Sequence, residues 1–370
     1  EGEEMSADAE SPVDGASGLV RVGPDDQNAS LAHEDEPAIK QPPQLAGRTL
    51  MVEGRRFFPR IVQPTGEPLK VLAQLGFNCV LLRESPTSEE QSEARQLGLW
   101  LVCPPPAAER LAHGRARAAS EITGILGWYL DEHAAALPPG QLQQWIEQIH
   151  ALDAEWERLV ILATPAAERI RSLPVDVVVL GRMVDGQGDS LFHHAEWLKQ
   201  QSTQLGVGMP CWLGVDLAGN DQWRAQVAGC AGRAAAPIAA IDEMQLATLA
   251  RLALTTECGG VVVRSNVNLA DSSPVIQRRS LALALVNLQL RLIEPWLTHG
   301  KLVGRATSSD PNWSAAVMQV DRARLAVPIR WNRDLAPATL TQPHVASLVV
   351  PGVPEASEVF ALSPVELRPL

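Results

Sequence analysis

The sequence lacks the features that mark several classes of protein. Its five cysteines lie far apart, with no CxxC pair and no zinc-ligand spacing, and their odd number argues against a complete disulfide framework. No P-loop and no GxGxxG segment occurs, so we expect neither a metal nor a nucleotide cofactor. No apolar run reaches the length of about 18 residues that a membrane-spanning helix requires.

Basic charge is also scarce. The net charge is −12, and residues 1–40 hold eleven acidic side chains against Arg21 and Lys40. No basic stripe is available for nucleic acid, which excludes that partner. Residues 1–47 are acidic and rich in Gly, Ser, Pro and Ala, a composition that cannot bury enough apolar surface to fold. We predict a disordered acidic leader over 1–47.

The next feature is a regular alternation of short apolar runs with helical patterns. The apolar runs are 57–62, 78–82, 99–103, 125–130, 159–163, 175–180, 210–215 and 259–264. Helical spacing marks 67–75, 88–97 (with Ser88 as its cap), 141–152, 190–205, 244–256 and 275–297. Strand followed by helix, eight times over, is typical of a closed parallel barrel. We predict an α/β fold, a (β/α)8 TIM barrel over 48–300, with an open doubly wound sheet as the rival.

After residue 300 the pattern changes to β-type runs without intervening helices. These runs are 302–306, 314–320, 323–330, 344–350 and 358–362, separated by turn-rich segments. Residues 301–370 therefore predict a small antiparallel β module. Before the barrel, 48–56 has the pattern of a short hairpin that would cover the barrel floor.

The sharpest local motif is GWYLDEH at 127–133. It places titratable side chains at the end of a barrel strand, which is where such barrels carry their chemistry. Strand alternation does not allow Asp131 and Glu132 both to face inward while the strand stays regular. A carboxylic acid packed against Trp128 or Tyr129 would have a raised pKa suited to general acid catalysis. The alternative is an ordinary strand-to-helix loop with one of these acids exposed near a helix start.

Other polar and aromatic residues lie near strand ends and could line a cleft. Arg182 and Arg264 could hold a carboxylate in its charged form and donate to sugar hydroxyls, or could be solvated charges at the barrel rim. Trp128 and Trp212 are candidate stacking platforms for a sugar. The substrate-binding set is thus Trp128, Asp131, Arg182, Trp212 and Arg264.

Several of these segments resemble the barrels of glycoside hydrolases. The resemblance is carried by 57–60, 66–69, LGFNCV at 75–80, GLWLV at 98–102, GWYLDE at 127–132, 244–253 and GGVV at 259–262. In those families the glutamate of the GWYLDE-like element is the general acid/base, which implies that role for Glu132. The partner carboxylate follows the seventh strand, where this chain offers Asp216. The resemblance implies a carbohydrate ligand, and it favours an extracytoplasmic or secreted location.

Two functional hypotheses remain open. In the first the chain is a glycoside hydrolase, with Glu132 as acid/base and Asp216 as nucleophile or stabiliser. In the second it is a catalytically inactive barrel, serving as a carbohydrate-binding or scaffolding module of a larger surface or secreted protein. The first is favoured by the Asp131-Glu132 pair and its aromatic neighbours, and the second by Asp216, which stands where the hydrolases carry glutamate. We predict a glycoside-hydrolase-like barrel that acts on or binds carbohydrate, with the inactive barrel as the alternative. The oligomeric state is not predicted.

Overall fold

A computed structural model of the chain describes most of the residues after the acidic leader. The described residues are 42–106, 124–154, 157–182, 191–206, 208–217, 225–226, 229–230, 243–308, 313–330, 344–349, 357–362 and 368–369. The expected leader lies outside them up to residue 41. Its last residues are described, and Gln44–Ala46 forms strand β1. None of the helices in these segments is long and apolar enough to span a membrane.

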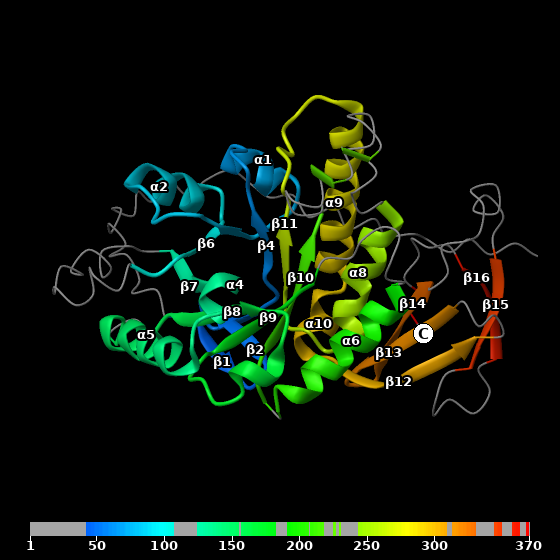
Figure 1. Ribbon diagram of the computed structural model, residues 1–370. Coiled ribbons are helices and arrows are strands. Elements are labelled where there is room, and N and C mark those ends of the chain that lie inside the picture. The colour runs from blue at the N-terminus through cyan, green and yellow to red at the C-terminus, as the bar shows by residue number, and fades with distance from the viewer. Residues whose placement is uncertain are drawn as a thin grey trace, which may run out of the picture. The chain divides into compact units, whose positions relative to one another are not determined.

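The centre of the fold is a closed barrel of eight parallel strands, which confirms the predicted (β/α)8 architecture (Figure 1). Around the barrel the strands follow the order β10-β11-β4-β5-β6-β7-β8-β9, so the last strand in sequence pairs with the first. The strands are β4 (Arg60–Gln63), β5 (Cys79–Leu81), β6 (Trp100–Cys103), β7 (Ile125–Leu130), β8 (Leu159–Thr164), β9 (Val177–Leu180), β10 (Cys211–Asp216) and β11 (Val261–Arg264). Closure excludes the open-sheet rival, because no edge strand remains.

A small antiparallel sheet precedes the barrel. Its strands are β1, β2 (Thr49–Val52) and β3 (Arg55–Phe57), in the order β1-β2-β3. Leu50 and Val52 pack in one apolar cluster with inward-facing residues from all eight barrel strands, so the sheet covers the barrel floor as predicted. Phe57 belongs to β3, and the first barrel strand begins only at Arg60.

Helices surround the barrel and bury one face against the outer side of its strands. They are α1 (Leu69–Gln74), α2 (Ser88–Gln96), α4 (Glu132–Ala135), α5 (Pro139–Leu152), α6 (Leu191–Gln204), α8 (Glu243–Thr255), α9 (Pro274–Leu292), α10 (Glu294–His299) and the 3-10 helix η2 (Ala167–Ile170). The cap of α2 is Thr87 rather than Ser88, because Thr87 and Glu90 form a reciprocal capping box. The predicted helix 275–297 is two helices, with Pro295 in the first turn of the second.

The segment after the barrel forms the predicted antiparallel β module. Its six strands follow the order β16-β15-β12-β13-β14-β17. They are β12 (Lys301–Ser308), β13 (Trp313–Val320), β14 (Ala323–Arg330), β15 (His344–Val349), β16 (Ser357–Leu362) and β17 (Arg368–Pro369). The domain boundaries at 47/48 and 300/301 stay a prediction.

Candidate functional site

The candidate site lies where barrel strands end, at the carboxyl end of the barrel. Asp216, Arg264 and Gln63 are the last residues of β10, β11 and β4, and the strand pairing places them side by side. Ser265 continues this row, because its hydroxyl donates to the Gln63 carbonyl at 3.2 Å. The barrel mouth is the position at which such folds carry functional groups.

Glu132 reaches the same place through a break in the strand. β7 ends at Leu130 and helix α4 begins at Glu132, so the alternation of a regular strand stops between them. Asp131 caps the helix, its Oδ1 accepting from the backbone N–H of Ala134 at 3.0 Å. Its other oxygen lies 3.2 Å from the His133 ring, and both side chains are exposed. Asp131 is therefore engaged in capping, and the structure gives no support to its predicted role in substrate binding.

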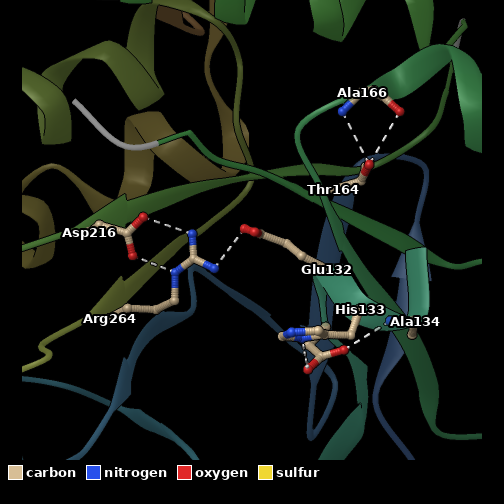
Figure 2. Close-up of polar contacts among 8 residues, drawn as sticks. Glu132, His133, Ala134, Thr164, Ala166, Asp216 and Arg264 are labelled. Atoms are coloured by element: carbon tan, nitrogen blue, oxygen red, sulfur yellow. Dashed lines mark hydrogen bonds and ion pairs between the residues drawn. The ribbon is translucent and has the colours of Figure 1, made fainter. Parts of the chain in front are cut away.

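One guanidinium joins the two predicted catalytic carboxylates (Figure 2). Arg264 Nη1 donates to Glu132 Oε1 at 2.8 Å. On its other side Arg264 holds Asp216 with two contacts, Nη2 to Oδ2 at 2.9 Å and Nε to Oδ1 at 2.6 Å. This two-point contact fixes the plane of the guanidinium relative to the Asp216 carboxylate. We call Glu132, Arg264 and Asp216 the mouth cluster.

The three side chains differ in their access to solvent. The exposed fraction is 43% for Glu132, 21% for Arg264 and 15% for Asp216. Burial raises the pKa of Asp216 above its ordinary value, although Arg264 opposes this effect. Burial alone would lower the pKa of Arg264, but the carboxylates of Asp216 and Glu132 outweigh it and raise that pKa. The arginine therefore stays charged between two acids.

The chain's single tyrosine belongs to the electrostatic surroundings of this cluster. Tyr129 packs against the barrel interior, one residue before the end of β7. Burial raises its pKa to about 12, and the charges of Arg264 and Glu132 act on it in opposite directions. Its hydroxyl is therefore a neutral group near the mouth cluster.

The two tryptophans proposed as sugar platforms are buried. The exposed fraction is 1% for Trp128 and 0% for Trp212. Trp128 packs in the layer between strands and helices, where its indole N–H donates to Asp153 Oδ2 at 3.1 Å. Trp212 fills the barrel interior near its floor, next to Gly259 and Gly260. Neither ring presents a face to a ligand, so this expectation is wrong.

Arg182 lies apart from the mouth cluster. Its guanidinium stacks over the ring of Trp197 in α6, 5.0 Å from the ring centre. His194 of the same helix is buried, and burial together with the charge of Arg182 lowers its pKa to about 4. Arg182 thus faces the helix layer, and of the predicted residues the structure brings together Glu132, Asp216 and Arg264.

The arrangement limits what the two carboxylates can do. Because one guanidinium contacts both, their nearest oxygens are at most about 8 Å apart, the length of two hydrogen bonds and one guanidinium. Two-carboxylate glycosidases need about 5–5.5 Å or roughly 6.5–9.5 Å, with the scissile bond between the acids. In this structure the space between Glu132 and Asp216 is filled by Arg264.

The sequence identifies all three members of the mouth cluster as candidate site residues, but it does not show that Arg264 bridges the two carboxylates. The sequence places these three residues at or just after the ends of barrel strands. That position predicts that they lie near one another, but it does not predict that Arg264 contacts both carboxylates. No group of three or more His, Cys, Asp or Glu side chains is placed to bind a metal ion among the described residues.

Comparison with known proteins gives a likeness of fold. No protein-family model matches the sequence, and no curated protein matches it. A crystal structure of an AmyP variant with maltotriose is similar, with a TM-score of 0.50, 11% identity and coverage of 84% of this chain and 96% of that one. The cyclic α-maltosyl-(1→6)-maltose hydrolase of Arthrobacter globiformis has a TM-score of 0.49 and 13% identity, over 82% and 88%. A noncanonic maltogenic α-amylase, AmyB of Thermotoga neapolitana, has a TM-score of 0.49 and 11% identity, over 78% and 88%.

At such low identity the likeness concerns the arrangement of the chain. The closed barrel and its surrounding helices contain the segments whose sequence resembles glycosidase barrels, and the antiparallel sheet follows them. The chain is a (β/α)8 barrel followed by a small antiparallel β module, and its fold is similar to that of the AmyP structure.

Proposed function

We propose that the barrel mouth binds carbohydrate through the mouth cluster and does not cleave it with Glu132 and Asp216 as an acid and nucleophile pair. The observation that carries this proposal is the single guanidinium of Arg264 in contact with both carboxylates. The cluster combines acceptors and donors in fixed positions at a partly exposed strand end, a combination suited to sugar hydroxyls.

Protonation gives the argument against cleavage. A general acid must carry a proton to the leaving oxygen, whereas a guanidinium in contact with a carboxyl group favours the charged form of that group. The contact between Arg264 and Glu132 therefore opposes the use of Glu132 as a general acid. Because the pKa of Arg264 is raised, the arginine stays charged at neutral pH. The Arg264–Glu132 ion pair is therefore not lost through deprotonation of the arginine.

A binding experiment tests the proposal directly. A panel of soluble oligosaccharides and polysaccharides is titrated calorimetrically into the full chain and into Glu132→Gln. We expect saturable binding of at least one carbohydrate and at least tenfold weaker binding by the variant, because Gln presents an amide where Arg264 needs a carboxylate. Glu147→Gln is the matched control, since Glu147 is an exposed glutamate on α5. Absence of binding across the panel contradicts the carbohydrate function.

The second candidate is hydrolysis, favoured by the two carboxylates at the barrel mouth, whose nearest oxygens are at most about 8 Å apart. Aryl-glycosides and polysaccharides are incubated with the same three proteins, and released sugar is measured. Turnover that is lost in Glu132→Gln by about 100-fold or more but kept in Glu147→Gln makes Glu132 a catalytic residue. That result overturns the binding-only proposal, and bound but uncleaved carbohydrate supports it.

A further inference from the structure

Two buried cysteines meet at the floor of the barrel, opposite the mouth cluster. Cys211 is the first residue of β10, and Cys258 lies three residues before β11. Their sulfur atoms are 3.8 Å apart. The Gly259 N–H donates to the Cys211 carbonyl at 2.8 Å, which holds the two backbone segments side by side. Cys79 and Cys103 are also buried, but no sulfur contact is recorded for either of them among the described residues.

We propose that Cys211 and Cys258 are a modification site, a dithiol that a small hydroperoxide converts into an intramolecular disulfide. A disulfide requires a sulfur separation of about 2.0 Å, so the two sulfurs must approach by less than 2 Å, a movement that side-chain rotation supplies. The backbone contact through Gly259 already brings the two segments into the range from which cysteines can be bridged.

A cavity gives a small oxidant access to one of the two thiols. This floor cavity has a volume of about 350 Å³, and its lining includes Cys258 together with Arg48, Arg56 and His299. Hydrogen peroxide is little larger than water and fits such a space, whereas a protein oxidant cannot reach a residue that is 3% exposed. Cys258 is therefore the thiol that meets the oxidant first.

The surroundings also make Cys258 the better nucleophile. A hydrogen bond from Cys211 lowers the pKa of Cys258 below its ordinary value, although burial acts in the opposite direction. The charge of Arg48 favours the thiolate further. The same hydrogen bond raises the pKa of Cys211, which stays a thiol. Because the thiolate is the reactive form, the two cysteines have different roles.

The reaction balances with hydrogen peroxide as the oxidant. The Cys258 thiolate attacks one peroxide oxygen, the O–O bond breaks, and after protonation of the leaving hydroxide a sulfenic acid and one water result. Cys211 then attacks the sulfenic sulfur, the S–O bond breaks, and a second water leaves with the Cys211 proton. In total two thiols lose two electrons and two protons, and the peroxide is reduced to two waters.

The experiment uses the full chain with Cys230→Ser, because Cys230 is the exposed cysteine and would react independently. The folded protein is treated with hydrogen peroxide, remaining thiols are alkylated, and the products are mapped by mass spectrometry. We expect a loss in mass of two hydrogens and a link between the tryptic peptides 200–224 and 252–264, reversed by dithiothreitol. Cys79→Ser is the matched control and should keep the link, whereas Cys258→Ser should lose it.

Three outcomes overturn the proposal. They are four alkylated cysteines after treatment, a stable sulfenic acid on Cys258, or a link that involves Cys79 or Cys103. These three readings come from the Cys230→Ser chain and need no substitution at a buried cysteine. A second measurement adds to them: the oxidised protein should have a higher Tm than the reduced protein, because the bond constrains the unfolded chain between residues 211 and 258. A Tm of the oxidised protein that is equal to or lower than that of the reduced protein contradicts a disulfide that forms without distorting the native backbone.

Discussion

Two ionic groups at opposite ends of the barrel are built from the same residue types and differ in their surroundings. Near the floor, Arg158 and Asp153 pair at 2.8 Å with side chains 3% and 4% exposed. At the mouth, Arg264 joins Glu132 and Asp216, and the exposed fraction rises to 43% at Glu132. The floor pair is enclosed, whereas one member of the mouth cluster remains open to solvent.

The hydrogen bonds of the two groups explain why one is structural and the other is available. Asp153 also accepts from the Trp128 indole at 3.1 Å and from the Arg158 backbone N–H at 3.0 Å, so its oxygens are fully used. Glu132 accepts one hydrogen bond from Arg264, at Oε1, and its side chain is 43% exposed. A charged group that keeps acceptor capacity near solvent can exchange partners with a ligand. A saturated, buried pair cannot do so without unfolding its surroundings.

The largest effect is expected at the floor pair. Asp153→Ala leaves Arg158 charged and buried, and should lower the free energy of unfolding by about 3–5 kcal/mol in urea denaturation. The double variant Asp153→Leu/Arg158→Met should recover only part of this loss, because the Trp128 and Arg158 N–H groups still lack their acceptor. A loss below about 1 kcal/mol for Asp153→Ala would show that the floor pair is as weakly coupled as a surface pair.

Arg264→Met should cost less, about 2–3 kcal/mol at pH 7, because Asp216 can take up a proton in response. The raised pKa of Asp216 means that the folded chain binds this proton more tightly than the unfolded chain does, so stability falls as the pH rises through that pKa. Without Arg264 the pKa of Asp216 rises further. The loss of unfolding free energy caused by Arg264→Met, measured by urea denaturation, should therefore be larger at pH 7 than at pH 4. Arg171→Met, at an exposed arginine, should show no such difference.

Arg251, another buried arginine, sharpens the comparison because its replacement should stabilise the fold instead of destabilising it. Arg251 of α8 donates from Nη1 to the Pro328 carbonyl at 3.3 Å, but its Nε and Nη2 have no partner within the described part of the chain. Burial lowers its pKa to about 10. We expect Arg251→Leu to raise the unfolding free energy by about 1–2 kcal/mol, since it removes a buried charge that no carboxylate of the described residues compensates. Arg158→Leu should instead lower the unfolding free energy, because it leaves Asp153 buried without its cation. Equal losses of unfolding free energy in Arg158→Leu and Arg251→Leu would contradict this prediction.

The smallest effect on stability is expected at the open side of the mouth cluster. Glu132→Gln should change the Tm by no more than about 2 °C, because an exposed ion pair contributes little. The same variant should weaken carbohydrate binding at least tenfold. Thermal unfolding with and without bound carbohydrate separates the two effects. A large loss of stability in the free protein would make Glu132 a structural residue like Asp153.

The order of elements was readable from the chain because each barrel strand is apolar on both faces. Val160, Ile161 and Leu162 are all buried, as are Val177, Val178 and Val179, so these strands appear as short continuous apolar runs bounded by polar residues. Boundaries were less accurate where a proline or a cap acts locally, as at Thr87 and Pro295. The positions of Glu132, Asp216 and Arg264 after strand ends also followed from the sequence, since strand polarity alone assigns them to the mouth.

What the sequence by itself determined was therefore the eight-fold alternation and the set of polar residues at one end of the barrel, because both depend on local periodicity. The tertiary structure decided the rest. Strand alternation would group Glu132 with the outward-facing Trp128, but the early start of α4 turns it toward Arg264. Barrel closure brings β11 beside β10 and places Arg264 against Asp216, far away in sequence. Such pairings depend on distances across the closed barrel, which no short-range pattern contains.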